Sequence, residues 1–218
     1  PEKFTINDSA VLPPLSDEEA VSAEVLRGPN IKEFPKGAPF VDTLAAPMVL
    51  KVGDNITTDH IMPAGAKILP YRSNIPHLSQ YCFAVCDETF PERAKAAGKS
   101  IIVGGSNYGQ GSSREHAPIA IKESGISLVI AKSFARIHQA NLINFGIVPM
   151  TLKCESDYDK IAEGEKIYIE GFAEAISSKD EAVLVTERGE KIPLVLTLSE
   201  RQREILLAGG MLNYTKNA

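Results

Sequence analysis

The chain has no long apolar segment, and this absence excludes one broad class of protein. No stretch of its 218 residues approaches the length of a membrane-spanning helix. The opening residues, PEKFTINDSAVLPP, lack the charged-then-apolar order of a secretory signal. The hydrophobic fraction of 44% and the charged fraction of 23% are typical of a soluble globular protein, for which we expect no membrane partner.

Cysteine is scarce and its count is odd. Cys82, Cys86 and Cys154 are the only three, which argues against a disulfide scaffold and for a reducing compartment. We therefore expect a cytoplasmic location, or the mitochondrial matrix in a eukaryote. Cys82 and Cys86 would share a face of a helix and could form a metal pair, but the apolar run YCFAVC favours buried thiols, so we expect no metal site.

The chain also lacks a basic stripe. Its 23 Lys and Arg residues are outnumbered by 28 Asp and Glu residues, and they are scattered. A net charge of −5 makes a nucleic-acid partner an unfavoured expectation, because such surfaces concentrate positive charge.

Proline divides the chain into two parts. Residues 1–46 contain prolines every few positions and little periodicity, so we expect an extended linker or arm. The chain begins without Met, and we expect it to be a piece of a longer protein. Residues 47–218 are expected to form one domain that opens with a strand at 47–52.

The pattern of residues 100–152 alternates between buried strands and helices. KSIIV, SLVIAKS and IVPMTL have the apolar runs of strands, and the helices between them end at Gly125 and Gly146. This order predicts an α/β fold with a mainly parallel sheet flanked by helices. The last third forms a β-rich portion, with a hairpin turn at ERGE and a final helix capped by Ser199.

The segment GGSNYGQGSSREHAPIAI, residues 104–121, leads from a strand through glycines into a helix. Such a junction directs backbone N–H groups at one point and binds anions. It matches neither a P-loop nor a dinucleotide motif, which favours a carboxylate with Arg114 as its partner. Ser112 and Glu115 also match a helix capping box, which explains only part of the segment.

Two further polar segments are candidates for chemistry. Asp59 and His60 lie in VGDNITTDHIMPAG, which is either a turn that satisfies its own backbone or an acid–base group. Arg72 lies in a loop between prolines and is either solvated or a ligand contact.

Four segments follow one another along the chain in this order: LRGPNIKEFP, DNITTDHIMPAG, NYGQGSSREHAPIA and KSFARIHQANLINFGIVPM. Together they resemble the C-terminal domain of the aconitase family, which includes isopropylmalate isomerase small subunits and homoaconitases. The resemblance covers nearly the whole chain. TTDH and KSFARIH are more similar to aconitase itself, and residues 1–46 resemble the linker before its last domain.

The resemblance implies a swivelling β/β/α lid domain of a hydro-lyase that interconverts citrate and isocitrate through cis-aconitate. It implies a [4Fe-4S] cluster ligated by three other domains of the same enzyme, or by a large subunit, and not by this chain. The implied catalytic residues are Ser112 as the base, with Asp59 and His60 in supporting roles.

The residues implied to bind the tricarboxylic acid substrate are Ser113, Arg114 and Arg72. Two departures concern this set: Arg72 lies one residue farther from Asp59 than in the mitochondrial type, and Met62 replaces a serine. For His116 and His138 we expect local packing roles.

Two alternatives remain. One is a separate small subunit of an isopropylmalate or homoaconitate hydratase, which the arm at residues 1–46 disfavours. The other is a non-enzymatic RNA-binding module, which the net charge disfavours.

Overall fold

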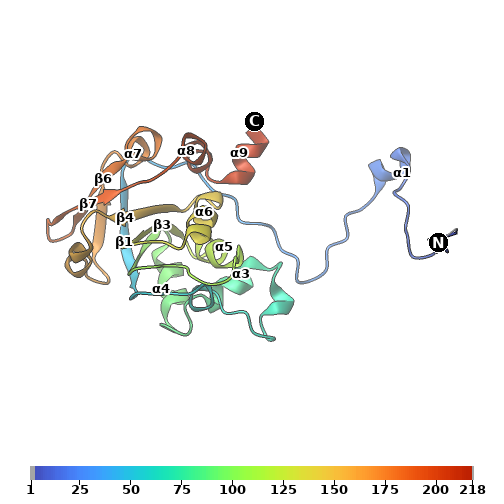
Figure 1. Ribbon diagram of the computed structural model, residues 1–218, viewed down its shortest axis with the longest axis horizontal. Coiled ribbons are helices and arrows are strands. Elements are labelled where there is room, and N and C mark those ends of the chain that lie inside the picture. The colour runs from blue at the N-terminus through green and yellow to red at the C-terminus, as the bar shows by residue number, and fades with distance from the viewer. Residues whose placement is uncertain (1–2, 218) are drawn as a thin grey trace.

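The computed structural model describes residues 3–217, in which an extended arm leads into a barrel of strands surrounded by helices (Figure 1). The arm contains one short helix, α1 (Asp17–Ser22), whose first turn is closed by a capping box between Ser16 and Glu19. None of the residues of α1 is buried, and the helix lies away from the barrel in Figure 1. Within residues 3–217, no helix is long and apolar enough to cross a membrane.

Seven strands form one closed barrel in the order β1-β2-β3-β4-β7-β6-β5. The first four strands pair in parallel with one another, and the remaining pairs are antiparallel. The strands are β1 (Leu44–Lys51), β2 (Ser100–Gly104), β3 (Ile126–Ala131), β4 (Val148–Leu152), β5 (Lys166–Ile169), β6 (Glu181–Thr186) and β7 (Lys191–Val195).

The predicted mainly parallel sheet flanked by helices is therefore wrong, although the mixed α/β class is right. The strands of the last third do not form a separate portion. They close the parallel half, because β5 pairs with β1 (Leu44 opposite Ile169) and β7 pairs with β4 (Leu152 opposite Leu194). Closure removes both free edges that an open sheet would leave.

Two apolar cores explain the residue pattern of the strands. Alternate residues of all seven strands fill the first core, for example Met48, Leu128 and Leu184. The remaining residues of β2 and β3, such as Ile102 and Val129, pack in the second core against the helices. The parallel strands are thus buried on both faces, which is why they appear in the sequence as continuous apolar runs.

The helices fall into two groups around the barrel (Figure 1). One group supplies the second core and lies near the parallel strands: α2 (Thr58–Ile61), α3 (Ile75–Leu78), α4 (Phe90–Ala97), α5 (His116–Glu123) and α6 (Arg136–Asn144). The other group belongs to the last third of the chain: α7 (Phe172–Ser178), α8 (Glu200–Leu207) and α9 (Met211–Asn217). Three 3-10 turns complete the elements: η1 (Leu69–Tyr71), η2 (Ser79–Tyr81) and η3 (Glu155–Lys160).

Several local predictions are confirmed. The strands and helices of residues 100–152 occur where expected, and α8 begins after Ser199, which accepts a hydrogen bond from the Gln202 N–H. The hairpin turn is also present, with the Thr186 N–H donating to the Glu190 carbonyl at 2.9 Å. The first strand begins at Leu44 instead of residue 47. The other helices of residues 3–217, namely α1, α2, α3, α4, α7 and α9, were not predicted.

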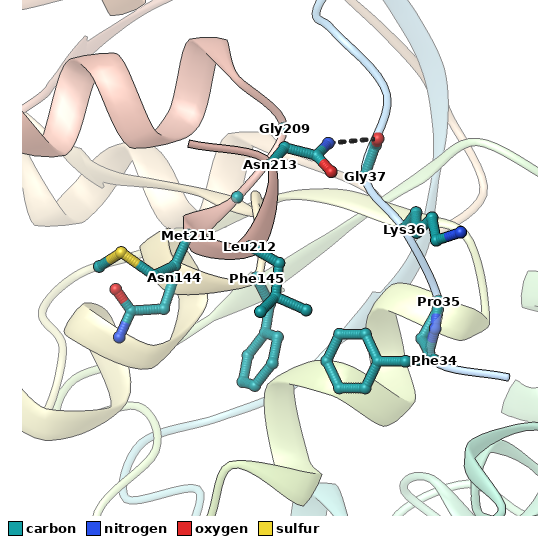
Figure 2. Close-up of a pocket in the computed structure, with 11 residues that line it drawn as sticks. Phe34, Pro35, Lys36, Gly37, Asn144, Phe145, Gly209, Met211, Leu212 and Asn213 are labelled. Atoms are coloured by element: carbon teal, nitrogen blue, oxygen red, sulfur yellow. Dashed lines mark hydrogen bonds between the residues drawn. The ribbon is translucent and has the colours of Figure 1, made fainter. Parts of the chain in front are cut away.

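The end of the arm contacts the C-terminal helices. Figure 2 shows Phe34, Gly37 and Asn213 around a hollow of about 290 Å³. The Asn213 side chain donates to the Gly37 carbonyl at 3.0 Å, and the rings of Phe34 and Phe145 lie 6.1 Å apart. Residues 3–27 are all exposed, so among the described residues of the arm only those near its end pack against the barrel.

Candidate functional site

Three loops meet at the carboxyl ends of the parallel strands. Residues 52–57 follow β1, residues 105–115 follow β2, and residues 132–135 follow β3. Because neighbouring parallel strands end at the same edge, the polar segments that the sequence marks are placed side by side. This edge is the candidate site.

Backbone hydrogen bonds join the first two loops. The Gly109 N–H donates to the Ile56 carbonyl at 2.7 Å, and the Thr58 N–H donates to the Gln110 carbonyl at 2.9 Å. Thr57 and Gln110 form an isolated parallel bridge. The loop that carries Ser112 is therefore held by the loop that carries Asp59.

Ser112 does not cap a helix, so the predicted capping box with Glu115 is wrong. Helix α5 begins only at His116, and its N-cap residue is Glu115, with no side-chain hydrogen bond. The Thr58 hydroxyl donates to the Ser112 carbonyl at 3.2 Å, and Gly111 before it has a φ of +108°. Ser112 lies in a bend and Ser113 in irregular backbone before the helix, and both residues are exposed.

Asp59 and Arg114 form an ion pair through Oδ1 and Nη1. The Asp59 side chain is 61% exposed and that of Arg114 is 27% exposed, so the pair lies at the surface with the arginine more covered. A guanidinium has five N–H donors in a planar fork, and the aspartate occupies only part of it. Arg114 is thus oriented while keeping donors for a second anion.

His60 is held by its own helix. Its N–H donates to the Thr57 hydroxyl at 3.1 Å, and its Nδ1 accepts from the Thr57 N–H at 3.0 Å. This capping box starts α2. An imidazole that accepts through Nδ1 carries its proton on Nε2, so the ring is fixed in one tautomer.

A hollow of about 190 Å³ opens beside the two serines. Its walls come from the start of α2, from the loops after β2 and β3, and from α6, and they contain the following residues: Thr58, Gly109, Gly111, Ser112, Ser113, Arg114, Ala135, Arg136, Ile137, His138 and Asn141. None of these residues is acidic, and two are arginines. The hollow therefore has the charge and the polar groups that suit a carboxylate.

Arg72 lies on the other side of Arg114. It is exposed, and with Arg114 and His116 it lines a second hollow of about 150 Å³ that does not include the serines. The His116 Nε2 lies 3.0 Å from the Arg72 carbonyl, so His116 joins this loop to the start of α5. Arg114 is thus shared by two hollows, one with Ser112 and one with Arg72.

The sequence reasoning assigned His138 to packing and did not consider Arg136. His138 is only 2% exposed, and neither ring nitrogen has a hydrogen-bond partner among residues 3–217. Burial lowers the pKa of His138 to about 4, so the imidazole is neutral near pH 7. One sequence signal could have identified these two residues. Arg136 and His138 lie two positions apart in the first turn of a helix that follows a buried strand after a short loop.

The cysteines do not assemble a metal or cluster site. Residues 82–86 form turns instead of a helix, Cys82 is buried, and Cys86 and Cys154 are exposed. Only Cys82 fits the expected buried thiol. Among residues 3–217 no three His, Cys, Asp or Glu side chains are grouped to hold a metal ion. The donors present do not fit a [4Fe-4S] cluster.

Comparisons with known proteins identify the family of the chain. The model of the aconitase C-terminal domain matches residues 51–155, which include the whole candidate site. The homoaconitase small subunit of Methanocaldococcus jannaschii is 40% identical over 168 residues, 76% of this chain and 88% of that protein. The mitochondrial aconitate hydratase of Gracilaria gracilis is 32% identical over 98% of this chain and 31% of its own length.

A solved structure gives the same result. The crystal structure of 3-isopropylmalate dehydratase from Methanocaldococcus jannaschii matches with a TM-score of 0.66 and 37% identity. The match covers 80% of this chain and 94% of that one. The chain described here belongs to the aconitase family, through the family's C-terminal domain.

Proposed function

We propose that this chain is the smaller part of an aconitase-family hydro-lyase and acts with a large subunit that carries a [4Fe-4S] cluster. The similar homoaconitase protein is itself a small subunit, and this chain covers 88% of it. This evidence favours the separate-subunit alternative over the lid domain of an aconitate hydratase. The substrate class is a hydroxy acid with two or three carboxylates.

One observation carries the proposal. The exposed Ser112 lies at a hollow that also contains Arg114 and Arg136. A serine hydroxyl is a weak base, so its alkoxide needs nearby positive charge to form at neutral pH. The two guanidinium groups supply that charge, and Asp59 orients one of them.

The proposed chemistry is the reversible loss of water. Ser112 takes the proton from the carbon beside a carboxylate, and the electron pair left behind forms a carbon–carbon double bond as hydroxide leaves the adjacent carbon. Ser113 and Arg114 bind a carboxylate at the same hollow, and Arg72 binds another from the second hollow. The cluster would bind the leaving hydroxyl, but its ligands lie outside this chain.

A second candidate is the last domain of an aconitate hydratase that acts on citrate. The alignment with the Gracilaria gracilis enzyme covers 98% of this chain and therefore extends over the arm, which the homoaconitase alignment at 76% does not fully cover. In this candidate the arm at residues 1–46 is the linker to the other domains.

The proposal is tested by Ser112→Ala in the complex with a cluster-loaded large subunit. Because the base would be lost while the carboxylate contacts remain, we expect turnover to fall by about 10²–10⁴-fold with little change in substrate binding. The matched control is Ser178→Ala, which removes an exposed hydroxyl on α7. Equal turnover for both variants would refute the assignment of Ser112.

A further inference from the structure

The start of α6 lies at the hollow, and no side chain caps it. The N-cap residue Ala135 offers no side-chain hydrogen bond, and the next three residues line the hollow. The first N–H groups of a helix have no acceptor within it, and they carry a partial positive charge. Helix α6 spans nine residues, so this end is that of a full helix.

His138, in the first turn of the same helix, gives an independent indication. His138 is one of the residues that line the hollow, and both of its ring nitrogens are buried without a partner among residues 3–217. Leaving a buried donor unsatisfied is unfavourable, so such groups usually have a ligand or another function.

The position of the ring is enforced by its neighbours. A Cβ added to Gly109 would lie 2.2 Å from two ring carbons of His138, so the backbone of Gly109 packs directly against the imidazole. The ring of Tyr108 lies 5.4 Å away, centroid to centroid. The orphaned nitrogens are therefore a fixed feature of the hollow.

The charges around the hollow select the kind of ligand. Arg114 and Arg136 line it, none of its lining residues is acidic, and Asp59, outside it, pairs with Arg114. A neutral imidazole donates one N–H bond, and the free N–H groups of α6 add further donors. This set of donors matches the oxygens of a carboxylate.

We propose that His138, Arg136 and the first turn of α6 form a carboxylate subsite next to Ser112, which holds one carboxylate of the substrate while Arg114 holds another. The inference rests on the proposed function for its substrate. It assigns a binding role to His138, for which the sequence predicted a packing role, and to Arg136, for which it predicted none.

The test measures binding without catalysis. Tricarballylate has three carboxylates and no hydroxyl, and its dissociation constant for the complex with the large subunit is measured by calorimetry. We expect His138→Leu to raise this constant about tenfold, because one hydrogen bond to a charged group is lost. His138→Gln keeps a side-chain N–H and is expected to recover part of the affinity.

Arg136→Gln is the second variant, because Arg136 is exposed and its replacement does not disturb a core. We expect it to weaken tricarballylate binding by about tenfold as well. Arg201→Gln removes an exposed arginine on α8 and is the matched control, expected to bind as the unaltered chain does.

Unchanged affinity in Arg136→Gln and in each folded His138 variant would overturn the subsite. Failure of the proposed function has a different signature, since the unaltered complex would then neither bind tricarballylate nor form an unsaturated acid. If His138 only packs, His138→Gln and His138→Leu will have the same affinity as the unaltered chain, whatever their stability.

Discussion

At the scale of single residues, His138 links the site to the stability of the fold. Its pKa is about 4 in the folded chain and near 6.5 when exposed, because burial disfavours the imidazolium. Arg114 and Arg136 are the charged residues that line the same hollow. The unfolded chain therefore binds a proton between pH 6.5 and 4 that the folded chain excludes.

We predict that this residue makes the chain sensitive to acid. Its contribution to the free energy of unfolding is complete above pH 6.5 and falls by up to about 3 kcal/mol as the pH drops through 4. His138→Leu should lose this part of the acid sensitivity, measured by urea unfolding at about pH 7 and about pH 4.5. The control His77→Gln, at a half-buried histidine, should keep it. Identical pH dependence in His138→Leu and the unaltered chain would contradict the prediction.

The backbone of Gly109 is the basis of a second prediction about a single residue. Its φ of +83° disfavours any residue with a Cβ, and a Cβ would overlap the His138 ring. We predict that Gly109→Ala lowers the free energy of unfolding by about 2 kcal/mol or more. Gly53→Ala is the control, because a Cβ there meets no atom within 4 Å and no positive φ is involved. Equal unfolding midpoints for the two variants would rule out this packing.

At the scale of elements, the hydrogen bond from Thr58 to Ser112 joins the start of α2 to the serine loop. We predict that Thr58→Val lowers the free energy of unfolding by about 1–2 kcal/mol, because the valine keeps the shape but not the donor. Turnover of the complex should fall as well, because the loop loses its fixed position. Thr197→Val, at an exposed threonine, is the control for both measurements. Full activity of Thr58→Val would show that the loop is held by its other bonds alone.

The arm is the second element with a direct test. Residues 3–27 are all exposed, and the arm meets the barrel only from about Asn30 onward, where Lys32 donates to the Ser73 carbonyl at 3.0 Å. A chain that begins at Gly28 should therefore unfold within about 2 °C of the full chain. A loss of many degrees would mean that the arm packs on the barrel in solution.

Some helices and strands could be predicted from the sequence, and the closure of the barrel could not. The strands and helices of residues 100–152 were predicted because apolar runs and helix-ending glycines are local signals. Closure of the barrel was not, because it depends on pairs such as Leu44 with Ile169, which are remote in the chain. The prediction that Ser112 caps a helix was wrong for a similar reason. The backbone of Ser112 bonds with Thr58, which lies 54 residues away in the chain.

The site was predicted in part. The resemblance to the aconitase family implied that Asp59, Ser112 and Arg114 belong to one site, and the structure places these three residues at one edge of the barrel. The separate position of Arg72 and the buried, unpaired state of His138 depend on how loops and α6 pack, which no spacing in the chain reveals.

At the scale of the whole molecule, the proposed function gives this chain one half of an active site. Arginines and serines line the hollow, and residues 3–217 contain no group of three His, Cys, Asp or Glu side chains that could hold a metal ion. The account therefore requires a second component that supplies the cluster and closes the hollow.

One measurement tests this central claim directly. The chain is titrated into a cluster-loaded large subunit of a homoaconitase or isopropylmalate dehydratase, and the unsaturated acid formed from the hydroxy acid is followed by its ultraviolet absorbance. The account predicts no product from either component alone and saturable activity from both together, lost in Ser112→Ala. Activity of the large subunit alone, or an active complex with Ser112→Ala, would contradict it.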